Sequence, residues 1–170
     1  MSTKKISYAG MMIALTIIFL VFASILPRAN SIFYILSSVC IMIIVWLFGT
    51  KEGFFVYIAC SLLGMFLIPN KLVSMVYIFI FGLYPIIKAL CEKGFPIYIE
   101  FSLKLSYYNL ALIILYFMFK LIIKEIPHFK FGVALTVISS EIIFILYDYL
   151  LTLILQKLKT LKIFGGTLHD

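Results

Sequence analysis

Two carboxylates inside a long apolar run are the residues of this sequence best suited to chemistry. Glu141 and Asp148 lie in the apolar segment 131–155 and are seven residues apart. At about 100° per residue, they point roughly 20° apart around a helix axis, and Ser140 and Thr152 extend the same polar stripe. Each acid near the middle of a membrane costs about 2.5–3.5 kcal/mol. We therefore expect both to face the interior of a helix bundle, each with a polar partner.

The depth of each acid suggests its role. Glu141 is ten residues beyond Phe131, which places it about 15 Å along the helix and near the midplane of a membrane. It either lines a cavity for a solute or ion, or only joins helices through Lys88, Asn109 or a tyrosine. Asp148 lies about 10 Å further toward the inner face. There we expect a structural pair with Lys88 or Asn109.

Two short connections carry cations and amides on the side that we predict to be outside. They read Pro27-Arg28-Ala29-Asn30 and Pro69-Asn70-Lys71. One interpretation is that Arg28, Asn30, Asn70 and Lys71 form the rim of an outward-facing pocket, above the depth of Glu141, for an anionic or zwitterionic solute. The other is that each is an ordinary turn, in which Pro stops a helix and Asn turns the chain.

A proline inside a further apolar run marks a third candidate feature. Pro85 follows Tyr84 and cannot donate to the helical ladder, so we expect a loosened turn near Gly82 and Leu83. The turn is either a tolerated kink or a flexible joint that exposes backbone carbonyls to a cavity. In the second case Tyr84 belongs to the substrate-binding residues.

Small residues recur four positions apart on three of the apolar runs. The pairs are Gly10 with Ala14, Cys60 with Gly64, and the series Gly132, Thr136 and Ser140. This spacing lets helix backbones approach closely in a membrane. We expect internal packing, with docking of a partner protein as the alternative for the first run.

The composition excludes most classes of soluble protein. Of the 170 residues, 65% are hydrophobic and 12% are charged, against about 25% charged in a soluble domain. No P-loop, GxGxxG, GxSxG or HExxH is present, and the only histidines are His128 and His169. We therefore predict a membrane protein that is not an enzyme and has no catalytic residue, metal site or cofactor. The net charge of +7 indicates basic helix ends beside lipid headgroups rather than nucleic acid.

The hydropathy predicts an all-α, compact bundle of six transmembrane helices in a single domain over residues 1–170. The expected spans are 6–26, 31–49, 53–68, 72–90, 105–123 and 131–155. The less hydrophobic segment 93–104 is either an amphipathic segment along the inner membrane interface or a simple loop. Nine Lys and Arg residues fall on the side of the termini and five on the other, which favours both termini in the cytoplasm (N-in/C-in) of a multi-pass protein of the cell membrane.

This layout resembles the substrate-binding (S) component of energy-coupling factor (ECF) transporters. The resemblance lies in the six spans, the lack of a nucleotide site, and Ala9, Gly10 and Ala14 on the first span. It implies capture of a small solute, a vitamin or a metal ion, in an outward-facing pocket. It also implies docking through Ala9, Gly10 and Ala14 onto a membrane coupling protein with two ATPase subunits, whose ATP cycle tilts the bundle. The familiar Ala-x-x-x-Ala is here Gly10-Met-Met-Ile-Ala14.

Other interpretations remain open at this point. The segments PNKLVSMVYIFIFGLYPIIK and LYDYLL also resemble small membrane proteins of low-GC Gram-positive bacteria. A non-transporting scaffold of a cell-envelope complex has the same size and span count, and there Glu141 is purely structural. A proton-coupled carrier that uses Glu141 and Asp148 is a third class, although no internal repeat supports alternating access.

Overall fold

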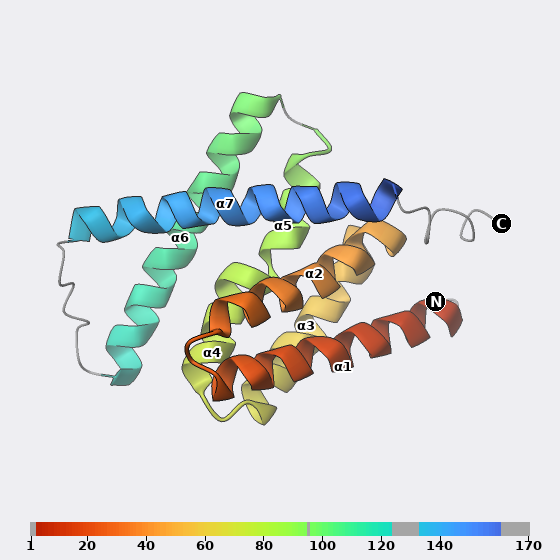
Figure 1. The fold of residues 1–170 in the computed structure, drawn as a ribbon, viewed down its shortest axis with the longest axis horizontal. Helices are drawn as coiled ribbons and strands as arrows, with labels where there is room; N and C mark the ends of the chain where they lie inside the picture. The colour runs from red at the N-terminus through yellow and green to blue at the C-terminus, as the bar shows by residue number, and fades with distance from the viewer. Residues whose placement is uncertain (1–2, 95, 124–132, 161–170) are drawn as a thin grey trace. The chain divides into compact units, whose positions relative to one another are not determined.

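The computed structural model describes residues 3–94, 96–123 and 133–160, and most of them are helical. In chain order the helices are α1 (Thr3–Ile25), α2 (Asn30–Phe48), α3 (Thr50–Leu67), α4 (Lys71–Val76), the π-helix η1 (Tyr77–Gly82), α5 (Tyr84–Cys91), α6 (Ile97–Ile123) and α7 (Val133–Thr160), as Figure 1 shows. The segments α4, η1 and α5 form one interrupted apolar stretch, Lys71–Cys91.

Six of these stretches are long and apolar enough to cross a membrane. The all-α, six-span architecture predicted from the sequence is therefore confirmed. The largest boundary difference is at the fifth span, where α6 begins at Ile97 instead of 105. Its first turn starts at Pro96, whose carbonyl accepts from the N–H groups of Ile99 and Glu100 at 2.9 and 3.0 Å. The segment expected as an interfacial piece or a loop is thus mostly the first two turns of a continuous helix.

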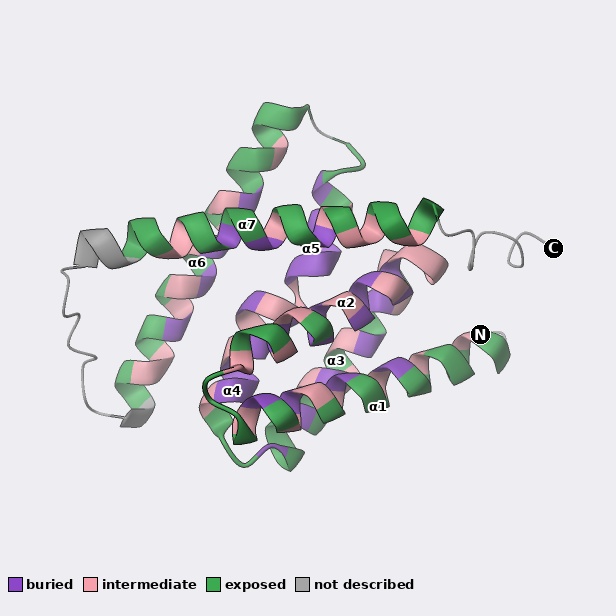
Figure 2. Ribbon diagram, in the orientation of Figure 1, coloured by how far each residue is buried: buried purple, intermediate pink, exposed green. Residues whose placement is uncertain are grey.

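The chain divides into two units, residues 1–124 and 125–170. In the described part of the first unit, α1, α2 and α3 pack together with η1 around an apolar core (Figure 2). Its fully buried members are Leu20, Ile41, Ile44, Cys60, Ile68 and Tyr77. The second unit is described by the single helix α7. The single domain over residues 1–170 stays a prediction.

The sharp turn between α2 and α3 depends on two glycines. Gly49 has a φ of +104°, a left-handed conformation that favours glycine. Gly53, one turn into α3, faces α2 so closely that a Cβ there would lie 2.2 Å from Cγ2 of Val45. The pair of glycines therefore lets α3 fold back directly along α2.

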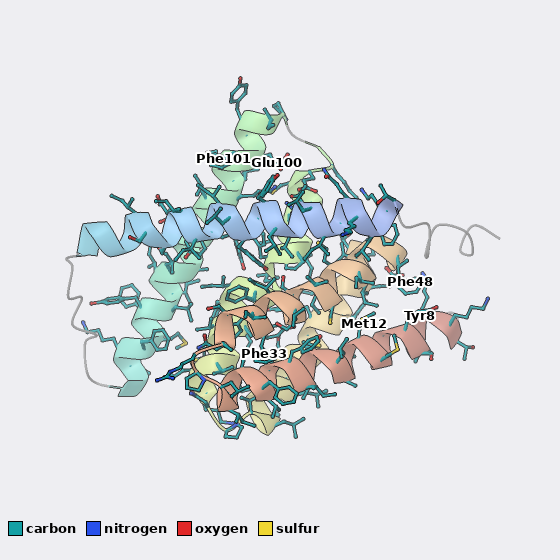
Figure 3. The ribbon with its side chains drawn as sticks, viewed as in Figure 1. Tyr8, Met12, Phe33, Phe48, Glu100 and Phe101 are labelled. Atoms are coloured by element: carbon teal, nitrogen blue, oxygen red, sulfur yellow. The ribbon has the colours of Figure 1, made fainter. Side chains whose placement is uncertain are left out.

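Side chains from three helices meet at the α2–α3 turn. The Lys5 ammonium of α1 lies 2.8 Å from a carboxylate oxygen of Glu52 on α3, and also 5.7 Å from the centre of the Phe48 ring. Tyr8 packs on the same ring, with 5.9 Å between the ring centres, and both rings are labelled in Figure 3. These contacts fix the beginning of α1 beside the turn on the side predicted to be cytoplasmic.

Candidate functional site

The turn between α3 and α4 uses its polar residues to close helices. Oδ1 of Asn70 accepts a hydrogen bond from the Leu72 N–H at 3.1 Å and so caps α4. The Lys71 ammonium donates to the carbonyls of Met65 and Ile68 at 2.6 and 3.1 Å, which closes the end of α3. Both residues thus have the turn role that the sequence offered as one interpretation, and binding of a solute by them stays a prediction.

The turn between α1 and α2 lies at the same end of the first unit as the α3–α4 turn (Figure 1). Arg28 is exposed, and Asn30 is the half-buried first residue of α2. Phe22 and Phe33 stack on either side of this turn, with 5.6 Å between their ring centres. The predicted rim residues are therefore brought to one end of the first unit.

The fourth span is irregular where Pro85 led us to expect it. The π-helix η1 ends at Gly82, and α5 begins at Tyr84 with the proline in its first turn. A π-helix is a rare deviation that is often found at functional sites. Tyr84 itself is fully buried and stacks on Tyr107 of α6, with 6.2 Å between ring centres.

The π-helix η1 receives hydrogen bonds from two tyrosines on neighbouring helices. Neither tyrosine was identified from the sequence. The Tyr57 hydroxyl of α3 donates to the Ile78 carbonyl at 3.1 Å, and the Tyr107 hydroxyl of α6 donates to the Phe79 carbonyl. Side-chain donors thus bind carbonyls at the irregular turn. The sequence feature that could have indicated these tyrosines is Gly82-Leu83-Tyr84-Pro85. A proline interrupts the backbone hydrogen bonds of a membrane helix, and the freed carbonyls then need donors from other helices.

The acids of α7 remain candidates. Glu141 and Asp148 lie on one continuous helix, Val133–Thr160. The polar stripe that the sequence predicted on one helix face requires such a helix. Ser140 donates to the Val137 carbonyl at 2.8 Å, and Thr152 donates to the Asp148 carbonyl at 3.0 Å. Both hydroxyls thus donate to backbone carbonyls of α7 itself. Because α7 is described by itself, the cavity role of Glu141 and the structural pairing of Asp148 stay predictions.

Lys88 and Asn109 have partners of their own in the first unit. The buried Lys88 ammonium lies 2.8 Å from a Glu92 oxygen, and the same oxygen is 3.2 Å from the ammonium of Lys104, also buried. Glu100 forms a further ion pair with Lys104. We call Lys88, Glu92, Glu100 and Lys104 the α5–α6 ion network. Asn109 donates to the Leu105 carbonyl at 3.0 Å.

The small residues of α1 are only partly used for packing. Ala9 is half-buried and packs against the core, whereas Gly10 and Ala14 are exposed. A Cβ on Gly10 would meet nothing within 4 Å. The internal packing that we expected for the Gly10–Ala14 pair is therefore absent in the described part of the first unit, while Cys60 and Gly64 are buried as expected.

Six apolar stretches within the described residues, one of them broken by a π-helix, and a first helix with exposed small residues define a polytopic helical membrane protein. The family model of the ECF-type riboflavin transporter S component matches residues 1–161. The chain belongs to this family. A search of curated proteins and a search of solved structures each returned no match.

Membership in this family decides several of the open interpretations. The protein is a multi-pass protein of the cell membrane and a transporter subunit, not an enzyme. S components bind a small solute and work with an ECF module of two ATPases and a membrane coupling component. Nothing in the match supports the scaffold interpretation.

Proposed function

We propose that this chain captures riboflavin, or a closely related flavin, from the outer side of the membrane. The observation that carries the proposal is the riboflavin-transporter S component match over residues 1–161. The aromatic surroundings of the fourth span agree with a flat ring as substrate, since Tyr34 stacks on Phe81 at 4.9 Å and Tyr84 stacks on Tyr107 at 6.2 Å.

We infer that the pocket opens at the end of the bundle where the two outer turns lie. The shared position of the two turns at one end of the first unit supports this location. The residues of the first unit proposed to bind the solute are Arg28, Asn30, Asn70, Lys71 and Tyr84. On α7, described by itself, the proposed substrate-binding residues are Ser140 and Glu141. Asp148, Lys88 and Asn109 are proposed to keep the helices together.

The proposed docking face for the coupling protein consists of Ala9, Gly10 and Ala14. Support comes from the exposure of Gly10 and Ala14 and from the open space around Gly10. A helix of the partner can approach the α1 backbone closely only where side chains are this small.

Binding is tested on the purified full chain in detergent by titration with riboflavin, followed by quenching of flavin fluorescence. We expect saturable binding of riboflavin and no competition by an unrelated vitamin such as biotin. Glu141→Gln should weaken the affinity without changing the thermal stability of the protein. The absence of riboflavin binding by the wild-type chain would refute the proposed substrate.

Docking is tested with Ala14→Leu, which fills the small-residue face, and with Met11→Leu as the matched control on an exposed position of the same helix. We expect Ala14→Leu to abolish riboflavin uptake by cells that contain an ECF module, and to leave flavin binding by the purified chain unchanged. Wild-type uptake by Ala14→Leu would exclude this face as the docking surface.

A further inference from the structure

Two hydroxyl groups in the described part of the first unit are buried without a hydrogen-bond partner. They are Oη of the fully buried Tyr77 in η1 and Oγ of Ser61 in α3, and neither makes a hydrogen bond within the described residues. The Cys60 thiol lies beside the Tyr77 hydroxyl, but a thiol is only a weak hydrogen-bonding group. The Tyr57 hydroxyl lies near Ser61 and donates its own proton to the Ile78 carbonyl at 3.1 Å. Both unpartnered hydroxyls can therefore still bind a polar ligand.

The depth of these hydroxyls makes them destabilising. Tyr77 is six residues beyond Lys71, the start of α4, and Ser61 is six residues before Leu67, the end of α3. Each therefore lies about 9 Å along its helix from the α3–α4 turn, within the hydrocarbon core of a membrane. A buried hydroxyl at such a depth has lost its hydrogen bonds to water and, without a partner, gains none in return. Phenylalanine and alanine would fill the same space without this cost, so packing alone does not explain the two hydroxyls.

A glycine fixes the place of the Tyr77 hydroxyl. A Cβ on Gly82 would lie 2.9 Å from Cζ of Tyr77, the ring atom that carries the hydroxyl, and 3.0 Å from two atoms of the Tyr57 ring. The two rings thus occupy the space that a side chain at position 82 would need. Because η1 packs against α3, which carries Ser61, the two unpartnered hydroxyls belong to neighbouring helices at the same depth.

We propose that the Tyr77 and Ser61 hydroxyls bind the hydroxylated side chain of the captured solute, so that this part of the site selects a flavin with a polyol chain. The inference rests on the proposed function and assigns the chemistry of one part of its pocket. Hydroxyl groups suit both residues, since a hydroxyl donates as well as accepts and carries no charge into the membrane. Entry past the α3–α4 turn leads to this depth. Because Tyr77 is fully buried, the solute reaches it only when η1 moves away from α3.

Tyr77→Phe tests the assignment, because it removes only the hydroxyl. A hydroxyl without a partner in the free protein contributes no stability, so we expect a Tm equal to or above that of the wild type. Riboflavin should bind about three- to tenfold more weakly, which corresponds to the loss of one hydrogen bond. Tyr57→Phe makes the same change on the neighbouring ring but removes the bond to the Ile78 carbonyl, and should therefore lower the Tm. Tyr98→Phe, at an exposed tyrosine, should change neither property.

A pair of ligands isolates the contact with the polyol chain. Lumiflavin has the ring of riboflavin but carries a methyl group in place of the hydroxylated chain. In titrations of the purified full chain followed by flavin fluorescence, we expect Tyr77→Phe to bind lumiflavin like the wild type while it binds riboflavin more weakly. Ser61→Ala should show the same pattern, so the contact is still tested if Tyr77→Phe does not fold.

The outcomes separate this inference from the proposed function. If Tyr77→Phe and Ser61→Ala both bind riboflavin like the wild type, the contact with the chain is wrong while riboflavin capture stands. An equal loss of affinity for riboflavin and lumiflavin also overturns the contact, because the hydroxyl then acts on the ring or on the packing. A lower Tm of Tyr77→Phe with unchanged riboflavin binding overturns it as well, since the hydroxyl then has a structural partner such as a bound water. If the wild-type chain does not bind riboflavin at all, the proposed function fails first.

Discussion

Replacing Gly53 with alanine should destabilise the protein, although alanine is the better helix former. In a helix interior, Gly→Ala normally stabilises by about 0.5–1 kcal/mol. Here the new Cβ would lie 2.2 Å from Cγ2 of Val45, and 3.4 and 3.5 Å from its Cβ and Cα. Ordinary contact begins near 3.4 Å, so Cγ2 must retreat by more than 1 Å. Val45 is 7% exposed and β-branched, with one preferred rotamer in a helix.

The size of the effect follows from the cost of overpacking. Forcing an extra methyl into a packed contact costs about 1–3 kcal/mol, which exceeds the gain in helix propensity at most of this range. A net loss of about 1–2 kcal/mol corresponds to a fall in Tm of about 2–8 °C for a domain of this size. Thermal unfolding of the purified protein in detergent measures it.

A double-mutant cycle identifies the contact. Val45→Ala removes Cγ2, so Gly53→Ala should cost much less in the Val45→Ala background than in the wild type. Gly94→Ala is the matched control, because a Cβ there would meet nothing within 4 Å. A Gly53→Ala protein as stable as the wild type would refute the claim that α2 and α3 touch at this glycine.

Three further substitutions test contacts in the first unit. Glu92→Gln removes a charge that two buried lysines share and should cost about 1–2 kcal/mol, because Glu92 is itself partly exposed and Lys104 keeps Glu100. Lys93→Gln, at an exposed neighbour, should be neutral in the same unfolding assay, and equal stability of the two variants would show the network to be energetically unimportant. Tyr57→Phe removes the donor to the Ile78 carbonyl and should lower stability by about 1 kcal/mol, with Tyr98→Phe, an 85% exposed tyrosine, as its control; an unchanged Tm for Tyr57→Phe would contradict the bond. Lys71→Met removes the donor to the end of α3 and should lower the Tm by about 2–4 °C, and an unaltered Tm would mean that the ammonium does not close that helix.

The architecture was predictable because its signals are local. Each span is a run of apolar residues bounded by proline, asparagine or charge, and length alone indicates a crossing helix. The break at Pro85 was predictable for the same reason, since the missing N–H is a property of one residue. The early start of α6 was not, because helix 97–104 contains Glu100 and Lys104 and reads as too polar for a span. Its lysine is neutralised by Glu92 and Glu100, which no periodicity indicates.

The candidate site was less predictable than the fold. Asn70 and Lys71 were expected either at a pocket or in a turn, and the hydrogen bonds place them in the turn without deciding the pocket. Tyr57 and Tyr107 escaped notice because tyrosine in an apolar run usually fills space. Their role depends on carbonyls that are far from them in the chain. Contacts of this kind appear only when helices are placed side by side.

The length of α6 has a consequence for the lipid that surrounds it. Its 27 residues extend over about 40 Å, whereas the hydrocarbon core of a bilayer is about 30 Å thick. The surplus lies in its first two turns, where Tyr98 is 85% exposed and suits the headgroup layer. A thicker bilayer would draw this segment into hydrocarbon together with the adjacent ion network, and a thinner one would tilt the helix. Membrane thickness thus becomes a variable to which the protein should respond.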